Sequence, residues 1–114
     1  MSIKIYHNPR CSKSRQTLAL IRERGLEPEV IEYLKTPPSE TELDHILSML
    51  AMEPMALMRR GEAEFKEQIR GKELSRTEAI ALMVQFPKVI ERPIVVNGDK
   101  AAVGRPPESV LDIL

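Results

Sequence analysis

Hydrophobic and polar positions predict a strand, a helix and a second strand in the first third of the chain. Residues 3–6 (IKIY) form a short run typical of a strand. Residues 12–24 follow with apolar side chains at helical spacing, which puts Leu18 and Ile21 on one face. Residues 29–33 (EVIEY) then indicate the second strand. Elements in this order form a βαβ unit, in which two parallel strands are joined by a right-handed crossover.

The middle of the chain has a helical pattern. Ser39 and Glu42 have the spacing of a capping box, in which a serine begins a helix and a glutamate three residues later completes the cap. Ser75 and Glu78 repeat the same device. Apolar residues recur at helical spacing after each box, and the polar stretch between them predicts broken helix. We therefore predict a mostly helical segment over residues 39–86.

The last third of the chain returns to strands. Apolar runs at residues 94–96 and 101–103 lie on either side of Asn97-Gly98, a strong signal for a β-hairpin. Residues 108–114 then resemble a final helix. The complete order is βαβ, helices, ββ and a helix, which predicts an α/β fold. We expect a four-stranded mixed sheet of the thioredoxin type, with the helical segment inserted in its middle.

Composition narrows the class of protein. The chain has 114 residues, a length that suits one domain over residues 1–114 with one core. Its 17 basic residues balance its 17 acidic residues, which argues against a nucleic-acid partner. No apolar run approaches the ~18 residues of a membrane span, and the first residues lack the apolar region of a signal peptide. We expect a soluble cytoplasmic domain.

The single cysteine, Cys11, is the strongest candidate for chemistry. It lies where the first helix is predicted to begin, and the free N–H groups and dipole there favour a thiolate. Arg10, Lys13 and Arg15 surround it, and His7 lies four residues upstream. We expect a thiol pKa below the ordinary ~8.5, and the same N–H groups suit a bound oxyanion. The alternative, a small buried hydrophobe, conflicts with these polar neighbours.

The spacing around Cys11 limits the reactions open to it. A dithiol motif would need a second cysteine at the position of Ser14, so an external thiol must complete any redox cycle. A phosphatase anion loop would need an arginine at the position of Thr17, which argues against tyrosine-phosphatase chemistry. One cysteine also excludes an intramolecular disulfide and a cysteine-only zinc site.

Three arginines are candidates for binding an oxyanion: Arg59, Arg92 and Arg105. Arg92 and Arg105 each precede a proline, which favours extended backbone. They flank the predicted hairpin, so the topology places both near the sheet edge that carries Cys11. Arginine is well suited to bind a multiply charged oxyanion through paired hydrogen bonds. The alternative for each arginine is an ordinary solvated surface position.

These residues resemble a known family. Residues 6–15 (YHNPRCSKSR) look like the active-site segment of the glutaredoxin-coupled arsenate reductases, the ArsC family, in particular a short subgroup of it. The resemblance covers nearly the whole chain, with further matching segments at residues 33–38, 57–60, 91–96 and 104–106.

The resemblance implies an oxidoreductase of arsenical resistance that reduces arsenate to arsenite. In it, Cys11 is the nucleophile, His7 helps to keep the thiol ionised, and the three arginines bind the oxyanion. Glutathione is the reducing co-substrate and glutaredoxin resolves the adduct, with no metal and no tightly bound cofactor. The Arg92–Pro93 bond is expected to be cis, as in thioredoxin-like folds. The residues expected to support the site are Asn8, Ser14, Arg15 and Pro93.

Two alternatives remain open at the level of sequence. A glutathione-dependent thiol–disulfide reductase would share Cys11 but would not require three arginines. A non-enzymatic regulator of the Spx type would bind RNA polymerase as a protein partner. Regulators of this type usually carry Cys-x-x-Cys, so Ser14 argues against that alternative.

Overall fold

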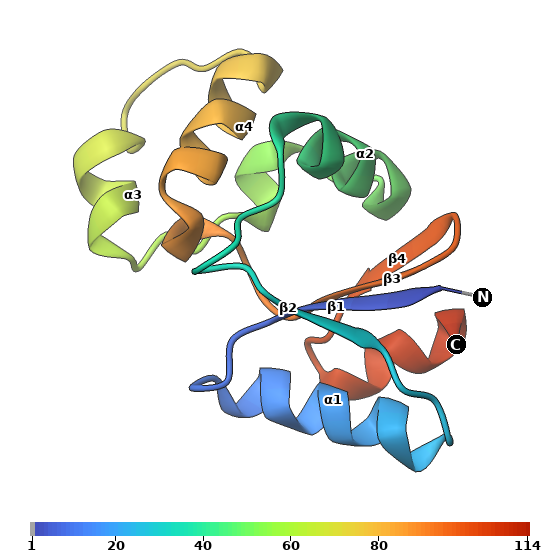
Figure 1. Ribbon diagram of the computed structural model, residues 1–114. Helices are drawn as coiled ribbons and strands as arrows, with labels where there is room; N and C mark the ends of the chain where they lie inside the picture. The colour runs from blue at the N-terminus through green and yellow to red at the C-terminus, as the bar shows by residue number, and fades with distance from the viewer. Residues whose placement is uncertain (1) are drawn as a thin grey trace. The chain divides into compact units, whose positions relative to one another are not determined.

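Four strands form one mixed sheet, in the order β2-β1-β3-β4, in the computed structural model, which describes residues 2–114 (Figure 1). The central strand β1 pairs parallel with β2 and antiparallel with β3. The edge strand β4 pairs antiparallel with β3. The predicted parallel βαβ unit and C-terminal hairpin are therefore confirmed, and the fold is thioredoxin-like. The strands are β1 (Ile3–His7), β2 (Glu29–Glu32), β3 (Ile94–Asn97) and β4 (Lys100–Val103).

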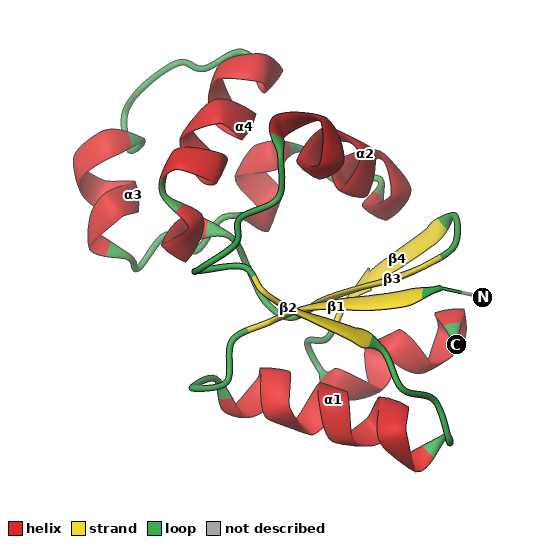
Figure 2. Cartoon of the chain, viewed as in Figure 1, coloured by secondary structure: helices red, strands yellow, loops and turns green. Residues whose placement is uncertain are grey.

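The chain divides into two compact units. The first comprises the chain up to Thr36 together with Arg92–Leu114, and contains the sheet, α1 (Ser12–Glu23) and the 3₁₀ helix η3 (Pro107–Ile113). The second, Pro37–Glu91, contains only helices and corresponds to the segment predicted over residues 39–86 (Figure 2). Its elements are α2 (Glu40–Leu50), η1 (Pro54–Leu57), α3 (Ala63–Gln68), α4 (Arg76–Gln85) and η2 (Pro87–Val89).

The core of the first unit lies between the sheet and two helices. Figure 1 shows α1 and η3 on the same face of the sheet. Ile5 of β1, Ile21 of α1, Val95 of β3 and Val110 of η3 are each 0% exposed and pack as one cluster. This cluster therefore holds the second half of α1, together with η3, against strands β1 and β3.

The two longer helices of the second unit, α2 and α4, begin at the capping boxes that the sequence predicts. Ser39 and Glu42 form a complete capping box at α2, and Ser75 and Glu78 form another at α4. Each box satisfies backbone N–H groups that the first helical turn would otherwise leave unpaired. The core of this unit is made of Leu43, Leu47, Leu57, Phe65 and Met83 among other buried side chains.

The hairpin turn lies one residue later than the Asn97-Gly98 signal predicts. The last strand pair is Asn97 with Lys100, so the two turn residues are Gly98 and Asp99. Gly98 has φ +63° while Asp99 has no positive φ, the pattern of a turn with glycine in its first central position. The shift has a tertiary cause, because Asn97 Nδ2 donates to the carbonyl oxygen of Ile113 at 2.6 Å and is thereby held in the strand.

The final helix is a 3₁₀ helix. Its inward residues are Pro107, Val110 and Ile113, of which the first two are buried and the third packs against the core cluster. A repeat of three residues matches the 3₁₀ helix, in which side chains at i and i+3 eclipse. Among residues 2–114, no helix combines the length and the apolar content that crossing a membrane requires.

Gly104 marks a close approach between the hairpin and α1. A Cβ atom at this position would lie 2.5 Å from Thr17 Oγ1 and 2.7 Å from Pro93 Cγ. We expect Gly104→Ala to lower the free energy of unfolding by about 1–3 kcal/mol, the usual range for overpacking, as measured by urea denaturation. Gly61→Ala is the matched control, because a Cβ there meets nothing within 4 Å. Equal stability of the two variants would contradict the close approach.

Candidate active site

Cys11 lies at the N-cap of α1, at the end of a tight loop that leaves β1. Its φ and ψ of −93° and 122° are those of extended backbone, and its side chain is partly exposed. Asn8 organises the loop: its carbonyl oxygen accepts the Cys11 N–H at 3.0 Å, and its Oδ1 accepts the Arg10 N–H at 3.0 Å. The loop therefore fixes the backbone of Cys11 directly before the first helical turn.

His7 and Ser14 lie under this loop and are both buried. Nδ1 of His7 is 2.6 Å from Ser14 Oγ, which also accepts the N–H of Asn8 at 3.0 Å. Burial is the main cause that holds the pKa of His7 below its ordinary value; Glu32 opposes the shift, and Arg22 and Arg15 reinforce it. A neutral ring can accept the Ser14 hydroxyl hydrogen at Nδ1. In this structure the hydrogen bond of His7 thus goes to Ser14 and ties β1 to α1.

The surroundings of the Cys11 sulfur favour the thiolate. Burial, the largest single effect, raises the pKa of Cys11, but the N–H groups of Ser14 and Lys13 and the Arg92 guanidinium together outweigh it, so the pKa lies below its ordinary value. The sulfur makes no capping hydrogen bond of regular geometry. The backbone N–H groups therefore act mainly through their partial positive charges at the helix N-terminus.

Arg105 reaches the same sulfur from the far end of the sequence. Its Nη2 lies 3.5 Å from Cys11 Sγ, and its Nε donates to the carbonyl oxygen of Arg92 at 2.8 Å. The Arg92–Pro93 bond is cis, as predicted, and the Arg105–Pro106 bond is also cis, which the sequence did not indicate. Gly104 N–H donates to the Pro93 carbonyl oxygen at 2.9 Å and continues the hairpin ladder between these segments. The structure thus brings Cys11, Arg92 and Arg105 together.

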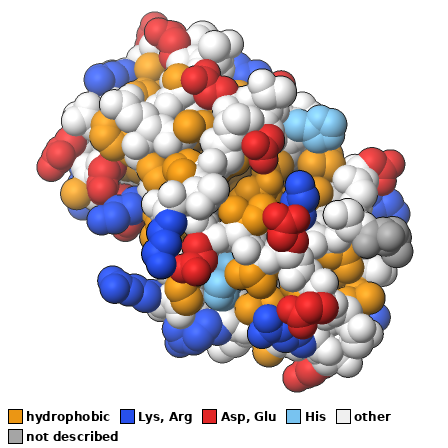
Figure 3. All heavy atoms as spheres, in the orientation of Figure 1, with side chains coloured by type: hydrophobic (Ala, Val, Ile, Leu, Met, Phe, Trp, Pro, Cys, Tyr) orange, Lys and Arg blue, Asp and Glu red, His pale blue; other side chains and the backbone are white. Residues whose placement is uncertain are grey.

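The other cations of the loop have different surroundings. Arg10, Lys13 and Arg15 are exposed, and Figure 3 shows Lys and Arg side chains at the edge of the molecule where the loop lies. Nη1 of Arg15 donates to the Pro9 carbonyl oxygen at 2.9 Å. Arg15 therefore stabilises the loop itself while it adds positive charge beside Cys11.

Comparison with known proteins places the chain in a family. The model of the ArsC family matches residues 6–113. The chain belongs to the ArsC family.

Individual relatives agree with this placement. The chain is 51% identical to the uncharacterised protein YfgD of Escherichia coli K12, over 98% of this chain and 96% of that protein. It is 44% identical to a protein of Haemophilus influenzae named arsenate reductase, with 100% of both chains covered. A solved structure of an arsenate reductase from Vibrio cholerae is 51% identical, with a TM-score of 0.95 over 100% of this chain and 98% of that one.

Arg59, the third arginine that resemblance to the ArsC family singles out, lies in the helical unit. Its Nη1 forms an ion pair with Glu91 Oε1 at 2.8 Å, and both side chains are 26% exposed. The backbone supports the pair, because Arg59 N–H donates to Val89 O at 2.7 Å and Glu91 N–H donates to Leu57 O at 2.8 Å. Arg59 Nε is buried without a hydrogen-bond partner among the described residues. The role of Arg59 in binding an oxyanion stays a prediction.

Glu91, the ion-pair partner of Arg59, is not among the site residues that the sequence predicts. It is separated from Arg59 by 32 positions, so no local spacing could pair the two. Its position directly before Arg92-Pro93, inside a matching segment, is the signal that could have drawn attention to it.

Among residues 2–114, no three His, Cys, Asp or Glu side chains gather as a metal-binding group.

The lowered pKa of Cys11 is directly measurable. We expect thiolate absorbance in the ultraviolet, followed against pH, to give a midpoint below the ordinary ~8.5 of a free thiol. Unfolding in denaturant should return the midpoint to the ordinary value, because the helix N-terminus and Arg92 then no longer act on the sulfur. A midpoint at or above that of the unfolded chain would contradict the electrostatic account.

Proposed function

We propose that the chain is an arsenate reductase that uses glutathione and glutaredoxin as its source of electrons. The observation that carries the proposal is the Arg105 guanidinium 3.5 Å from Cys11 Sγ, with Arg92 beside it. A nucleophilic sulfur between two planar cations and a helix N-terminus suits attack on a multiply charged oxyanion. The names of the relatives in Haemophilus influenzae and Vibrio cholerae support arsenate as that oxyanion.

In the first step the Cys11 thiolate attacks arsenic. An As–S bond forms, one arsenate hydroxyl takes up a proton and leaves as water, and arsenic stays at oxidation state +5. Arg92 and Arg105 stabilise the negative charge on the remaining oxygens, as a rigid guanidinium does best. Arg59 is expected to bind the same oxyanion, as the resemblance implies.

In the second step external thiols supply two electrons. Glutathione replaces another arsenic hydroxyl, which leaves as water, and a glutaredoxin thiolate attacks the glutathione sulfur. The electron pair of the As–S(glutathione) bond stays on arsenic, which becomes +3, and a glutathione–glutaredoxin disulfide leaves. Water then releases arsenite and restores Cys11. This reaction needs a reducing compartment, which favours the cytoplasm.

A steady-state assay tests the proposal. We expect arsenate-dependent oxidation of glutathione with purified protein and glutaredoxin, and none when either thiol partner is left out. A glutathione mixed disulfide serves as the competing substrate. Turnover of the mixed disulfide without turnover of arsenate would replace the proposal by a thiol–disulfide reductase.

A further inference from the structure

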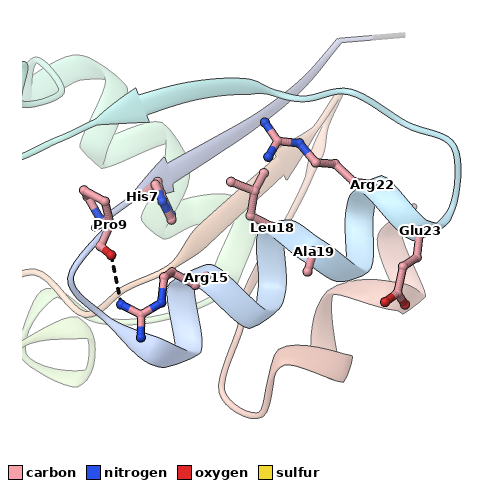
Figure 4. A pocket seen from close by; sticks show the side chains of 7 residues that line it. All are labelled: His7, Pro9, Arg15, Leu18, Ala19, Arg22 and Glu23. Carbon is pink, nitrogen blue, oxygen red and sulfur yellow. Dashed lines mark hydrogen bonds between the residues drawn. The ribbon is translucent and has the colours of Figure 1, made fainter.

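A groove of about 640 Å³ runs along one side of α1, entirely within the first unit (Figure 4). Leu18 and Ala19 contribute apolar surface to it, and Figure 4 shows Leu18 between Arg15 and Arg22 along the helix. Figure 4 shows the Arg22 guanidinium and the Glu23 carboxylate on opposite sides of the helix. The side chains that line the groove are His7, Pro9, Arg15, Leu18, Ala19, Arg22 and Glu23.

The groove adjoins the loop that carries Cys11, because His7 and Pro9 line it. Arg15, Leu18 and Arg22 follow along α1 at intervals of three and four residues, the spacing of one helical stripe. The N–H of Arg15 donates to the Cys11 carbonyl oxygen at 3.0 Å, so the two residues are one turn apart. A molecule lying in the groove would therefore have one end at the loop that carries Cys11.

We propose that this groove binds the reductant, a tripeptide thiol with two carboxylates, of which glutathione is the representative. The inference rests on the proposed function and assigns the surface on which its second substrate lies. Arg15 and Arg22 are seven positions apart along the helix, or roughly 10 Å at 1.5 Å per residue. Three extended peptide residues span about the same distance. The two cations are thus spaced for the two carboxylates of such a peptide.

Two cations, Arg15 and Arg22, and one carboxylate, Glu23, line the groove, and the carboxylate lies on the other side of the helix from the Arg22 guanidinium. Nε and Nη2 of Arg22 bind the Glu27 carboxylate, with Nη2 to Oε2 at 3.0 Å, which orients the guanidinium and leaves its other N–H groups for a ligand. Arg15 likewise uses Nη1 on the Pro9 carbonyl oxygen. Burial, Arg22 and Arg15 lower the pKa of His7 at the wall of the groove, whereas Glu32, whose effect exceeds that of either arginine, raises it.

A binding titration tests the groove without requiring turnover. The probe is S-methylglutathione, whose blocked thiol cannot react, added to isotope-labelled protein and followed by amide chemical shifts. We expect shifts at Arg15, Leu18, Ala19 and Arg22, and none with the diethyl ester of the same probe, which lacks both carboxylates. Absence of shifts in the groove at millimolar probe, or equal shifts with the ester, would overturn the inference.

Two arginine variants make the test specific. Arg22→Leu is expected to raise the dissociation constant of S-methylglutathione about fivefold, the upper range for an exposed charge pair. Arg24→Leu removes the same charge roughly 200° around the helix and is expected to leave the constant unchanged. Equal effects of the two variants would show general electrostatics and reject the groove.

Kinetics separate the failure of this inference from that of the proposed function. In the coupled assay Arg22→Leu should raise KM for glutathione about fivefold and leave KM for arsenate within about twofold. If the wild-type protein does not reduce arsenate, the proposed function fails, and the titration still reports on the groove. If it does reduce arsenate but KM for glutathione is the same in Arg22→Leu and Arg24→Leu, the groove is rejected.

Discussion

Cys11→Ser is expected to reduce arsenate turnover by on the order of 10³-fold or more, as removal of a nucleophile does. The N–H groups of Lys13 and Ser14 and the Arg92 guanidinium lower the pKa of the thiol. The same groups cannot ionise an alcohol, whose pKa is far higher. The variant should fold normally, because serine differs from cysteine by one atom and the side chain is only partly buried.

The measurement is kcat/KM for arsenate, with circular dichroism and the urea midpoint as checks on the fold. Ser12→Ala is a suitable control, since Ser12 is the exposed neighbour of Cys11 on the same turn. We expect that control to retain most of its activity. Turnover by a folded Cys11→Ser protein would remove Cys11 from the mechanism.

Arg92→Lys and Arg105→Lys are each expected to reduce arsenate turnover by ~10-fold or more, about 1.4 kcal/mol of transition-state stabilisation. Lysine keeps the positive charge but loses the planar fork that binds two oxygens at once. Lysine at position 105 also loses the Nε hydrogen bond to the Arg92 carbonyl oxygen, 2.8 Å long in this structure. Arg24→Lys, an exposed position at the end of α1, is the matched control.

A second readout shows whether the arginines act on the oxyanion or on the sulfur. Alkylation of Cys11 by a neutral reagent should proceed at a rate close to wild type in both lysine variants, because the positive charge near the thiol is kept. Loss of arsenate turnover together with unchanged alkylation would identify oxyanion binding. Wild-type arsenate turnover in both variants would reject the arginine clamp.

Local signals predicted most of the fold. The capping boxes at Ser39 and Ser75 depend on residues three positions apart, so the sequence alone reveals them. The hairpin turn and the form of the last helix could not be predicted in the same way. Asn97 stays in its strand because its side chain bonds the carbonyl oxygen of Ile113, which is 16 residues away. That contact exists only once both elements pack.

The candidate site also has features that neighbouring residues predict and features that depend on tertiary contacts. The position of Cys11 at a helix start follows from neighbouring residues, and the hairpin topology predicted that Arg92 and Arg105 would lie near it. The contact between Arg105 and Cys11 joins residues 94 positions apart, so its approximate location could be predicted but its geometry could not. The Arg59–Glu91 ion pair carries no local signal at all, because backbone pairing between Met58 and Ile90 creates it.

The β3–β4 hairpin has a practical consequence for studying this protein. Arg92 and Arg105 lie just beyond its open end, while the Gly98–Asp99 turn lies at its closed end, four strand pairs away. At ~3.3 Å per residue, that separates the turn from the arginines by more than 10 Å. A fluorescent label or affinity tag placed in the turn would leave the spacing of the two guanidinium groups unchanged. A one-residue deletion within either strand, by contrast, would shift one arginine against the other.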